Sequence, residues 1–481
     1  MDPVVTTLVI LADLAVRRLA MTLDWPDSPS WIIAAVVLVA AAVLFVALRP
    51  RAQRSIAQRA RTAVSTGAVP VQKDAVPDSA ATLAATEVVG DAMTAAGYSV
   101  VTVRQALEEI ASVNHLPWSQ AVVFPTALLV SARGEGADHR TGAVSSGEGS
   151  LLLAQIDELQ RTVDAARIGA LGPESTIERV QWIRALPPRY GRTLRVLGYL
   201  LLSAALAVML GTSWTGVALA AALGAVVGAA LLVSEQVPST YSALITVGVA
   251  FGVALVVFLL IDAGFGSRLV PALIAPLVVL LPGSLLTTGV FELSTGQMIS
   301  GAGRLAAGGM QLVLLGAGIV TAAALVGLPD FDFSEQPEAL GPVAPWIAVA
   351  VFGVGIAVHQ CAAPRSIPWI LLVLYVAYGA QVIGGIFLGG ILSAFIGALV
   401  VTPVTALAAM QPTGPAARVS FIPAFWLLVP GALGLVGVAD LLGGDTSGTN
   451  TLAATIGTMV AIALGVLAGS VVSNRMQRPA L

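Results

Sequence analysis

Residues 282–293 read PGSLLTTGVFEL, and residues 430–441 read PGALGLVGVADL. The opening Pro-Gly pair, a leucine, a glycine, a valine and the final leucine recur in register, and Glu292 is matched by Asp440. The two stretches are 148 residues apart (430 − 282). The same offset carries the apolar run at 194–210 close to another at 345–360. The chain is therefore predicted to contain an internal repeat.

Apolar runs surround both copies of this motif. A membrane-spanning helix needs about 20 mainly apolar residues, and ten such runs follow residue 192. They lie at about 194–210, 213–233, 241–261, 269–291, 306–327, 345–360, 367–383, 385–409, 420–439 and 451–473. Each copy thus holds five spans, and an odd number forces the second copy to enter the membrane in the opposite orientation. The predicted fold class is a polytopic α-helical membrane protein with ten core transmembrane helices in two inverted five-helix repeats, an architecture of many secondary transporters.

The composition agrees with a membrane protein that has a polar front end. The 481 residues are 57% hydrophobic and 11% charged, whereas a soluble domain carries about 25% charged residues. Residues 1–192 hold 17 basic and 18 acidic side chains, and the rest of the chain holds 7 and 9. We expect a cytosolic α/β accessory domain before the membrane part. Its predicted helices lie near 80–96, 100–113, 150–169 and 173–185, with strands near 119–131.

These patterns divide the chain into six expected segments. They are an N-terminal segment at 1–48 with an extra transmembrane helix at 31–48, a linker at 49–80, the accessory domain at 81–192, the first five-helix repeat at 193–327, an external acidic loop at 328–344 and the second repeat at 345–481. Arginines follow the run at 31–48, whereas a signal peptide starts positive and then turns apolar. We therefore interpret 31–48 as a retained helix, with a signal peptide as the alternative.

Arginine positions predict the orientation, because cytoplasmic loops carry an excess of positive charge. Five arginines between Arg179 and Arg195 crowd the start of the first span. Alternation from there places Arg304, Arg365 and Arg418 in the cytoplasm, together with the C-terminus and residues 49–192. The acidic loops then lie outside. Only Arg268 breaks the pattern.

The sequence lacks the motifs that define several functional classes. Lys73 is the single lysine, so no phosphate-binding G-x-x-x-x-G-K-[ST] loop exists. The three histidines lie far apart, Cys361 is the single cysteine, and no G-x-S-x-G nucleophile motif occurs. The net charge of −3 gives no sign of a nucleic-acid partner. We expect no enzyme, no catalytic residue, no metal and no cofactor.

Longer motifs resemble a known family, the bacterial threonine/serine exporters. They are LLPGSLLTTGVFELSTGQMISGAGRL at 280–305, the AAGYS turn, VRQALEEIA and VVFPTALLVS within 93–132, and the stretch 151–190 that ends in ALPPRY. The resemblance covers about 80–478, although His115 stands where the family would have glycine and 31–48 lies outside its motifs. It implies export of threonine and serine from the cytoplasm, driven by the proton motive force. Split two-chain relatives are linked to dicarboxylate export, which is an alternative.

The repeated motif also supplies the candidate site residues. Proline removes a backbone donor from a helix, so Pro282-Gly283 and Pro430-Gly431 are predicted helix breaks that line the substrate path. The alternative is a tolerated kink. The polar side chains of the first copy are the other candidates for the path: Ser284, Thr287, Thr288 and Gln297. Their hydroxyls could instead bond to the preceding turn of their own helix.

Glu292 and Asp440 are the candidate proton-coupling residues. Charges within a bilayer are costly and usually mark pathways or partners, and these two carboxylates are related by the repeat. The alternative is a solvated, structural position at the membrane surface. The sequence thus predicts a multi-pass exporter of the bacterial cytoplasmic membrane with protons, lipid and a small amino acid as partners, and a homo-oligomer is possible. A channel or passive facilitator, and a membrane-anchored sensor or enzyme, are the competing classes.

Overall fold

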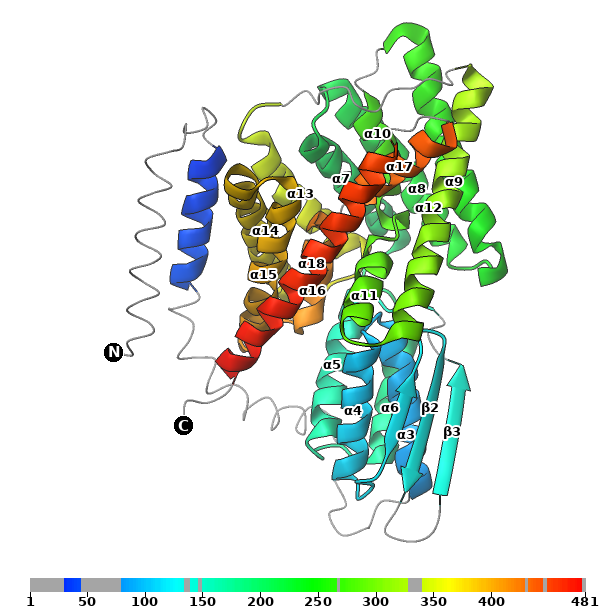
Figure 1. Ribbon diagram of the computed structural model, residues 1–481, viewed down its shortest axis with the longest axis vertical. Coiled ribbons are helices and arrows are strands. Elements are labelled where there is room, and N and C mark those ends of the chain that lie inside the picture. Colours follow the sequence, from blue (N-terminus) through cyan, green and yellow to red (C-terminus); the bar gives the residue numbers. More distant parts are fainter. Residues whose placement is uncertain are drawn as a thin grey trace.

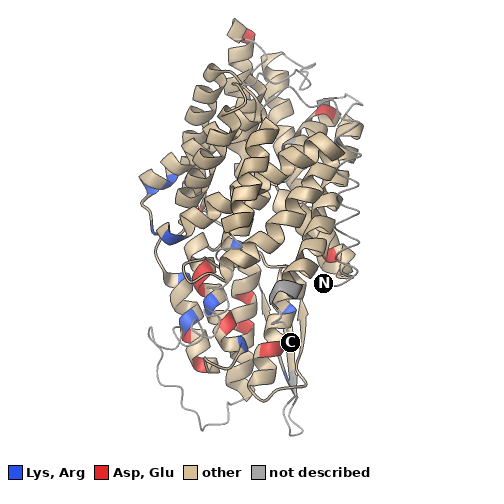
Figure 2. Ribbon diagram, turned by 90° about the vertical axis from the view of Figure 1, so that its left-hand side faces the viewer, with Lys and Arg blue, Asp and Glu red and all other residues tan. Residues whose placement is uncertain are grey.

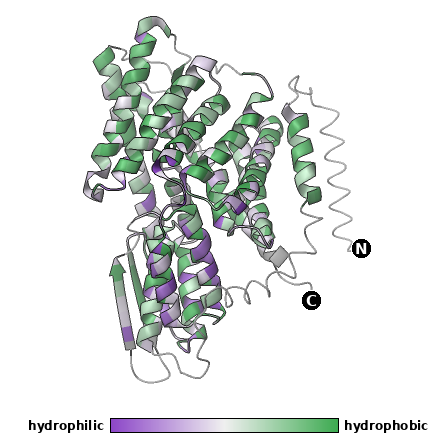
Figure 3. Cartoon of the chain, turned by 180° about the vertical axis from the view of Figure 1, so that it is seen from behind, coloured by the Kyte–Doolittle hydropathy of each residue, from purple (hydrophilic) through white to green (hydrophobic). Residues whose placement is uncertain are grey.

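The structure is a computed structural model that describes residues 30–44, 79–133, 139–145, 149–265, 269–327, 340–428, 431–443 and 448–477. Figure 1 shows a large body of helices with a smaller unit of helices and strands below it. We call the smaller part the α/β unit (79–185) and the larger part the helical body (192–477). Charged residues gather on the α/β unit (Figure 2), and the helical body is mostly hydrophobic (Figure 3).

The α/β unit consists of four helices beside one antiparallel sheet with the strand order β1-β2-β3. Its elements are α3 (Ser79–Ala95), α4 (Val100–Val113), β1 (Gln120–Val123), β2 (Ala127–Arg133), β3 (His139–Ser145), α5 (Leu153–Arg167) and α6 (Pro173–Ala185). Leu107 on α4, Leu128 on β2 and Leu159 on α5 are almost fully buried together in one core. The predicted helices coincide closely with α3 to α6, while the polar β3 lies beyond the predicted strands.

Two local signals fix the ends of α4. The Ser99 hydroxyl accepts a hydrogen bond from the Thr102 N–H at 3.4 Å, which caps the first turn. At the other end His115 has a φ of 62°, a backbone conformation that favours glycine. The expected glycine at this position therefore has a conformational reason, and His115 adopts the same backbone shape.

Seven helices of the described chain are long and apolar enough to cross a membrane. Within these spans, the helices are α7 (Arg192–Leu210), α8 (Trp214–Ser234), α9 (Ser242–Leu260), α12 (Met298–Val326), α14 (Ile367–Leu388), α15 (Gly390–Ala409) and α18 (Gly448–Gln477). The apolar helix α13 (Ala344–His359) is shorter. The N-terminal helix Ser30–Leu44 is also shorter than a span, and residues 45–48 of its predicted range lie outside the described residues.

Two further spans are bent. The first consists of α10 (Val270–Ile274), η4 (Ala275–Leu280) and α11 (Gly283–Ser294), with a bend of 57°. The second consists of α16 (Ala417–Leu428) and α17 (Gly431–Gly443), with a bend of 44°. Counting each bent pair as one span gives up to nine candidate spans in the described chain. The chain is thus a mostly helical, polytopic membrane protein.

The helix that follows each bend packs closely against the next long helix. A Cβ atom added at Gly301 would lie 2.7 Å from the carbonyl oxygen of Gly289, so α11 and α12 touch through their backbones. A Cβ atom at Gly448 would lie 2.5 Å from the carbonyl oxygen of Gly437, and α17 and α18 touch in the same way. In addition α12 packs against α17, and α18 packs against α11. Small residues allow such close approach between membrane helices.

Candidate functional site

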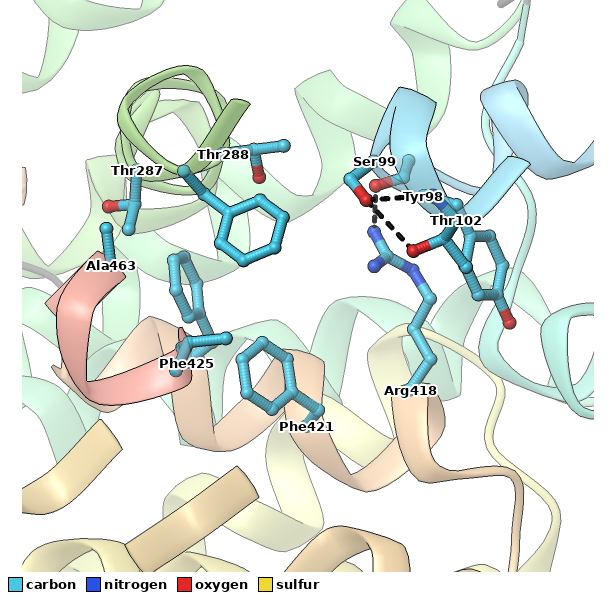
Figure 4. A pocket seen from close by; sticks show the side chains of 12 residues that line it. Tyr98, Ser99, Thr102, Thr287, Thr288, Arg418, Phe421, Phe425 and Ala463 are labelled. Carbon is cyan, nitrogen blue, oxygen red and sulfur yellow. Dashed lines mark hydrogen bonds between the residues drawn. The ribbon is translucent and has the colours of Figure 1, made fainter. Parts of the chain in front are cut away.

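A small cavity lies where the α/β unit meets the helical body. Its volume is about 170 Å³. Four segments line it: the turn between α3 and α4 together with the first turn of α4, and the helices α11, α16 and α18. Figure 4 shows the side chains around it. Residues far apart in the sequence therefore meet at one place.

Arg418 is the cation of this cavity. Its guanidinium donates hydrogen bonds to the main-chain carbonyls of Ala96 (2.9 Å) and Gly97. It also lies over the ring of Tyr98, 4.5 Å from the ring centre, a favourable cation–π distance. Gly97 has a φ of 74°, which turns the chain so that consecutive carbonyls face Arg418. The AAGYS turn is thus held by a residue of the helical body.

Tyr98 anchors the same turn from inside the α/β unit. Its hydroxyl donates a hydrogen bond of 2.5 Å to the side-chain oxygen of Gln160. Burial raises the pKa of the Tyr98 phenol, so it stays neutral and remains a donor. The hydrogen bond to Gln160 therefore holds in place the tyrosine ring that Arg418 covers.

Hydroxyl groups form the rest of the polar lining. Ser99 and Thr102 stand on one side, with their oxygens 2.9 Å apart. Thr287 and Thr288 of α11 stand on the other (Figure 4). The Thr287 hydroxyl is buried, with the residue 2% exposed, and has no hydrogen-bond partner among the described residues. An unpartnered buried hydroxyl costs about 1–3 kcal/mol, and this one is directed away from the cavity (Figure 4).

The remaining wall is apolar. Phe421 and Phe425 of α16 lie stacked with their ring centres 5.4 Å apart (Figure 4), and Phe291 of α11 also lines the cavity. Ala463 and Val466 of α18 complete this wall. Apolar walls exclude water and strengthen electrostatic contacts inside a cavity.

An ion pair between α11 and α12 lies beside the cavity. Glu292 is fully buried, and both its carboxylate oxygens accept hydrogen bonds from the Arg304 Nε, at 3.1 and 3.0 Å. One of these oxygens also accepts a hydrogen bond of 3.0 Å from the Val100 N–H, at the start of α4. Arg304 contacts the Tyr98 carbonyl at 3.4 Å. The carboxylate therefore sits at a helix N-terminus, where negative charge is stabilised.

Further contacts fix the α/β unit on the body. Asp157 of α5 is 1% exposed, accepts a hydrogen bond of 2.7 Å from the Ala416 N–H and pairs with Arg365 at 3.1 Å. The Leu153 N–H donates to the Gln360 carbonyl at 2.9 Å. The junction is thus a continuous, hydrogen-bonded interface around the cavity.

The sequence model of the family described as "Putative threonine/serine exporter" (ThrE) matches residues 85–326, half of the chain. The chain belongs to the threonine/serine exporter family. No curated protein and no solved structure matches the chain. The matched residues cover the α/β unit from α3 onward and the body as far as α12. The family identifies this integral membrane protein as a transporter and not an enzyme, with a small amino acid as its substrate.

The structure of this exporter-family protein separates the predicted path residues into groups. Thr287 and Thr288 line the cavity. Pro282 and Gly283 begin the same helix, at the bend, so the interruption predicted for this copy lies where the motif placed it. Ser284 is exposed, and Gln297 precedes α12; neither lines the cavity.

The second copy of the motif lies elsewhere. In Figure 1, α17 lies toward the end of the body opposite the α/β unit, whereas α11 lies against that unit. Asp440 of α17 is half-buried. Gly431 begins α17, and Pro430 lies outside the described residues. None of the described α17 residues 433–442 lines the cavity.

Sequence reasoning missed Arg418, Ser99 and Thr102 as residues of this exporter's cavity. It used Arg304 and Arg418 only as markers of the cytoplasmic side. The sequence did contain a signal, because only seven basic residues follow residue 192. A charged side chain within a membrane protein body usually has a charged partner or lines a pathway.

Proposed function

We propose that this protein exports threonine and serine across the bacterial cytoplasmic membrane, driven by the proton motive force. The observation that carries the proposal is the cavity beside α11, the helix that follows the first bend, because hydroxyl groups and Arg418 line this cavity. The chain also belongs to an exporter family. Transport sites commonly lie where membrane helices are interrupted. The cavity is small enough to select a small polar molecule.

The ten-helix body is proposed to be two inverted five-helix repeats, 193–327 and 345–481. Two observations support it: the glycine contacts of α11 with α12 resemble those of α17 with α18, and each long helix also packs on the bent helix of the other copy. The proposed substrate path follows both bends, with the cavity as its inner end. Its residues are Pro282, Gly283, Ser284, Thr287, Thr288, Gln297, Pro430 and Gly431.

The α/β unit and the C-terminus are proposed to lie in the cytoplasm, with the acidic loop at 328–344 outside. Single cysteines introduced at Glu174 and Thr215, both exposed, test this orientation in intact cells. The native Cys361 is buried, so it stays silent toward a membrane-impermeant thiol reagent. We expect Thr215→Cys to react and Glu174→Cys to resist, and the reverse pattern would invert the proposed topology.

Proton coupling is proposed to run through Glu292, with Asp440 as the weaker partner of the second copy. Protonation would remove the charge that holds Arg304 and would weaken the contact with the Val100 N–H. The groups that face Glu292 belong to α4, α11 and α12, so a proton there would loosen the α/β unit from the body. Access to the cavity and protonation would then be linked.

Transport in proteoliposomes tests the function. Purified protein is reconstituted, and threonine accumulation is measured with and without an imposed pH gradient. We expect accumulation against a concentration gradient only when the pH gradient is present. Equilibration without accumulation would favour a passive facilitator, and accumulation of a dicarboxylate in place of threonine would favour the alternative substrate.

A further inference from the structure

Arg418 differs from the other arginines at the junction. Arg304 pairs with Glu292, Arg365 pairs with Asp157, and both carboxylates are buried. Arg418 has no carboxylate within 4.0 Å among the described residues, and its hydrogen bonds go to two neutral carbonyls. Buried or partly buried charges are normally paired. A cation without a counter-charge, at the wall of a cavity, points to an anionic ligand.

We infer that Arg418 binds the carboxylate of the exported molecule, and that the cavity takes a small amino acid with a hydroxyl side chain. This inference rests on the proposed function. A guanidinium carries five N–H donors in a planar fork that fits a carboxylate. The two hydrogen bonds to Ala96 and Gly97 hold the group in place and use donors on Nε and one Nη only. Donors remain for the ligand.

The neutral lining fits the rest of such a molecule. Thr288, Ser99 and Thr102 offer three hydroxyl groups to the cavity, and Thr287 lines it from the same helix as Thr288. Hydroxyls both donate and accept, so they can bind an ammonium group and a hydroxyl group. The phenylalanine wall, with Phe421 and Phe425 stacked, offers an apolar surface to a methyl group. Arg418 is the only charged side chain of the lining among the described residues. The carboxylate is therefore the one group of the ligand that can form an ion pair in the cavity.

Ligand binding also explains why the α/β unit reaches the cavity. The carbonyls of Ala96 and Gly97 orient Arg418, and Ser99 and Thr102 form one wall. The site is incomplete without this unit. The helical body alone would present Arg418 with its guanidinium unsupported.

Equilibrium binding to the full-length protein in lipid nanodiscs tests the inference. The probes are threonine, threoninamide (which lacks the carboxylate charge) and succinate. We expect Arg418→Gln to raise the Kd for threonine at least tenfold, because a hydrogen bond to a charged group contributes that much or more. Threoninamide should bind the native protein at least tenfold more weakly than threonine does. Its binding should change little further in Arg418→Gln, since the interaction is then already absent.

Arg365→Gln is the matched control. It also removes an arginine contact between the α/β unit and the body, but Arg365 does not line the cavity. We expect its Kd for threonine to equal that of the native protein. Equal losses in both variants would show that Arg418 only holds the α/β unit in place, and would overturn the inference.

The outcomes separate the site from the function. Unchanged threonine affinity in Arg418→Gln, in a protein that exports threonine, overturns the carboxylate site and leaves the function standing. Arg418-dependent binding of succinate but not threonine supports the carboxylate site and overturns the proposed substrate. If Arg418→Gln does not fold, the native protein still decides, because equal affinity for threonine and threoninamide contradicts the inference.

Discussion

The hairpins α11–α12 and α17–α18 are alike in their backbones and different in their side chains. In each, a glycine in the middle of the shorter helix meets a glycine at the start of the longer one: Gly289 with Gly301, and Gly437 with Gly448. Both shorter helices follow a bend in a span. The backbone arrangement of the repeated motif is therefore common to both copies.

The chemistry is confined to one copy. Thr287 and Thr288 of α11 line the cavity, whereas the corresponding residues of α17 are Leu435 and Val436. Glu292 is fully buried in the junction, whereas its counterpart Asp440 is half-buried. The comparison teaches that both copies of the repeat share a backbone arrangement. The cavity-lining threonines and the buried ion pair of Glu292 with Arg304 belong to the copy that contacts the α/β unit. The predictions below test this division.

The largest difference is expected between Glu292→Gln and Asp440→Asn. The first change leaves the Arg304 guanidinium buried without its counter-charge, which costs about 3–5 kcal/mol in comparable pairs. The second affects a half-buried group and should cost much less. Thermal unfolding of the purified proteins measures both. Glu292→Gln should also lose gradient-driven threonine accumulation while retaining exchange between equal pools.

A double variant separates stability from coupling. Glu292→Gln combined with Arg304→Gln removes both charges, so much of the lost stability should return, while accumulation stays absent. If Glu292→Gln still concentrates threonine with an unchanged pH dependence, Glu292 is purely structural. A larger loss in Asp440→Asn than in Glu292→Gln would reverse the comparison.

The two glycine contacts should be equally sensitive. Gly301→Ala and Gly448→Ala each place a methyl group within 2.7 Å of a facing carbonyl oxygen, and overpacking of this kind costs about 1–3 kcal/mol. Gly303→Ala is the control, because a Cβ atom there meets nothing within 4 Å. Thermal unfolding should show similar losses for the first two variants and none for the third. A neutral Gly448→Ala would show that the backbones of the two copies are not equivalent.

The smallest expected effect concerns the threonines. Thr287→Val removes an unpartnered buried hydroxyl at constant shape, so the protein should become slightly more stable, by about 1 kcal/mol, with an unchanged Kd for threonine. Leu435→Thr makes the opposite change in α17, where Leu435 is 1% exposed. It should lower stability and leave the threonine Kd unchanged. Weaker threonine binding in Leu435→Thr would show that the second copy of the motif contributes to the binding site.

Much of the helical architecture follows from the sequence because hydrophobicity along the chain is a local property. The predicted run at 213–233 coincides with α8, and the helix at 100–113 coincides with α4. The interruption before Gly283 follows from proline chemistry. The strand β3 was missed because its sequence, HRTGAVS, carries no apolar alternation; it forms by pairing with β2.

The site was only half predictable, since its polar groups depend on partners distant in sequence. Thr287 and Thr288 follow from the motif. Arg418 could not be assigned, because a lone arginine near a span looks the same whether it marks a loop or binds a ligand. Its contacts with Ala96 and Gly97 cross more than 300 residues of chain. Such pairings become visible only when the α/β unit is placed on the body.

The bond between the Val100 N–H and Glu292 has a consequence for biosynthesis. The two residues are 192 positions apart, so at about 5–20 residues per second the ribosome makes Glu292 some 10–40 seconds after Val100. During that interval the first turn of α4 lacks the carboxylate that later accepts its N–H. The α/β unit emerges first, and its contact with Glu292 can form only after α11 has been synthesised. The contact between α4 and Glu292 is therefore a late step in the assembly of the protein.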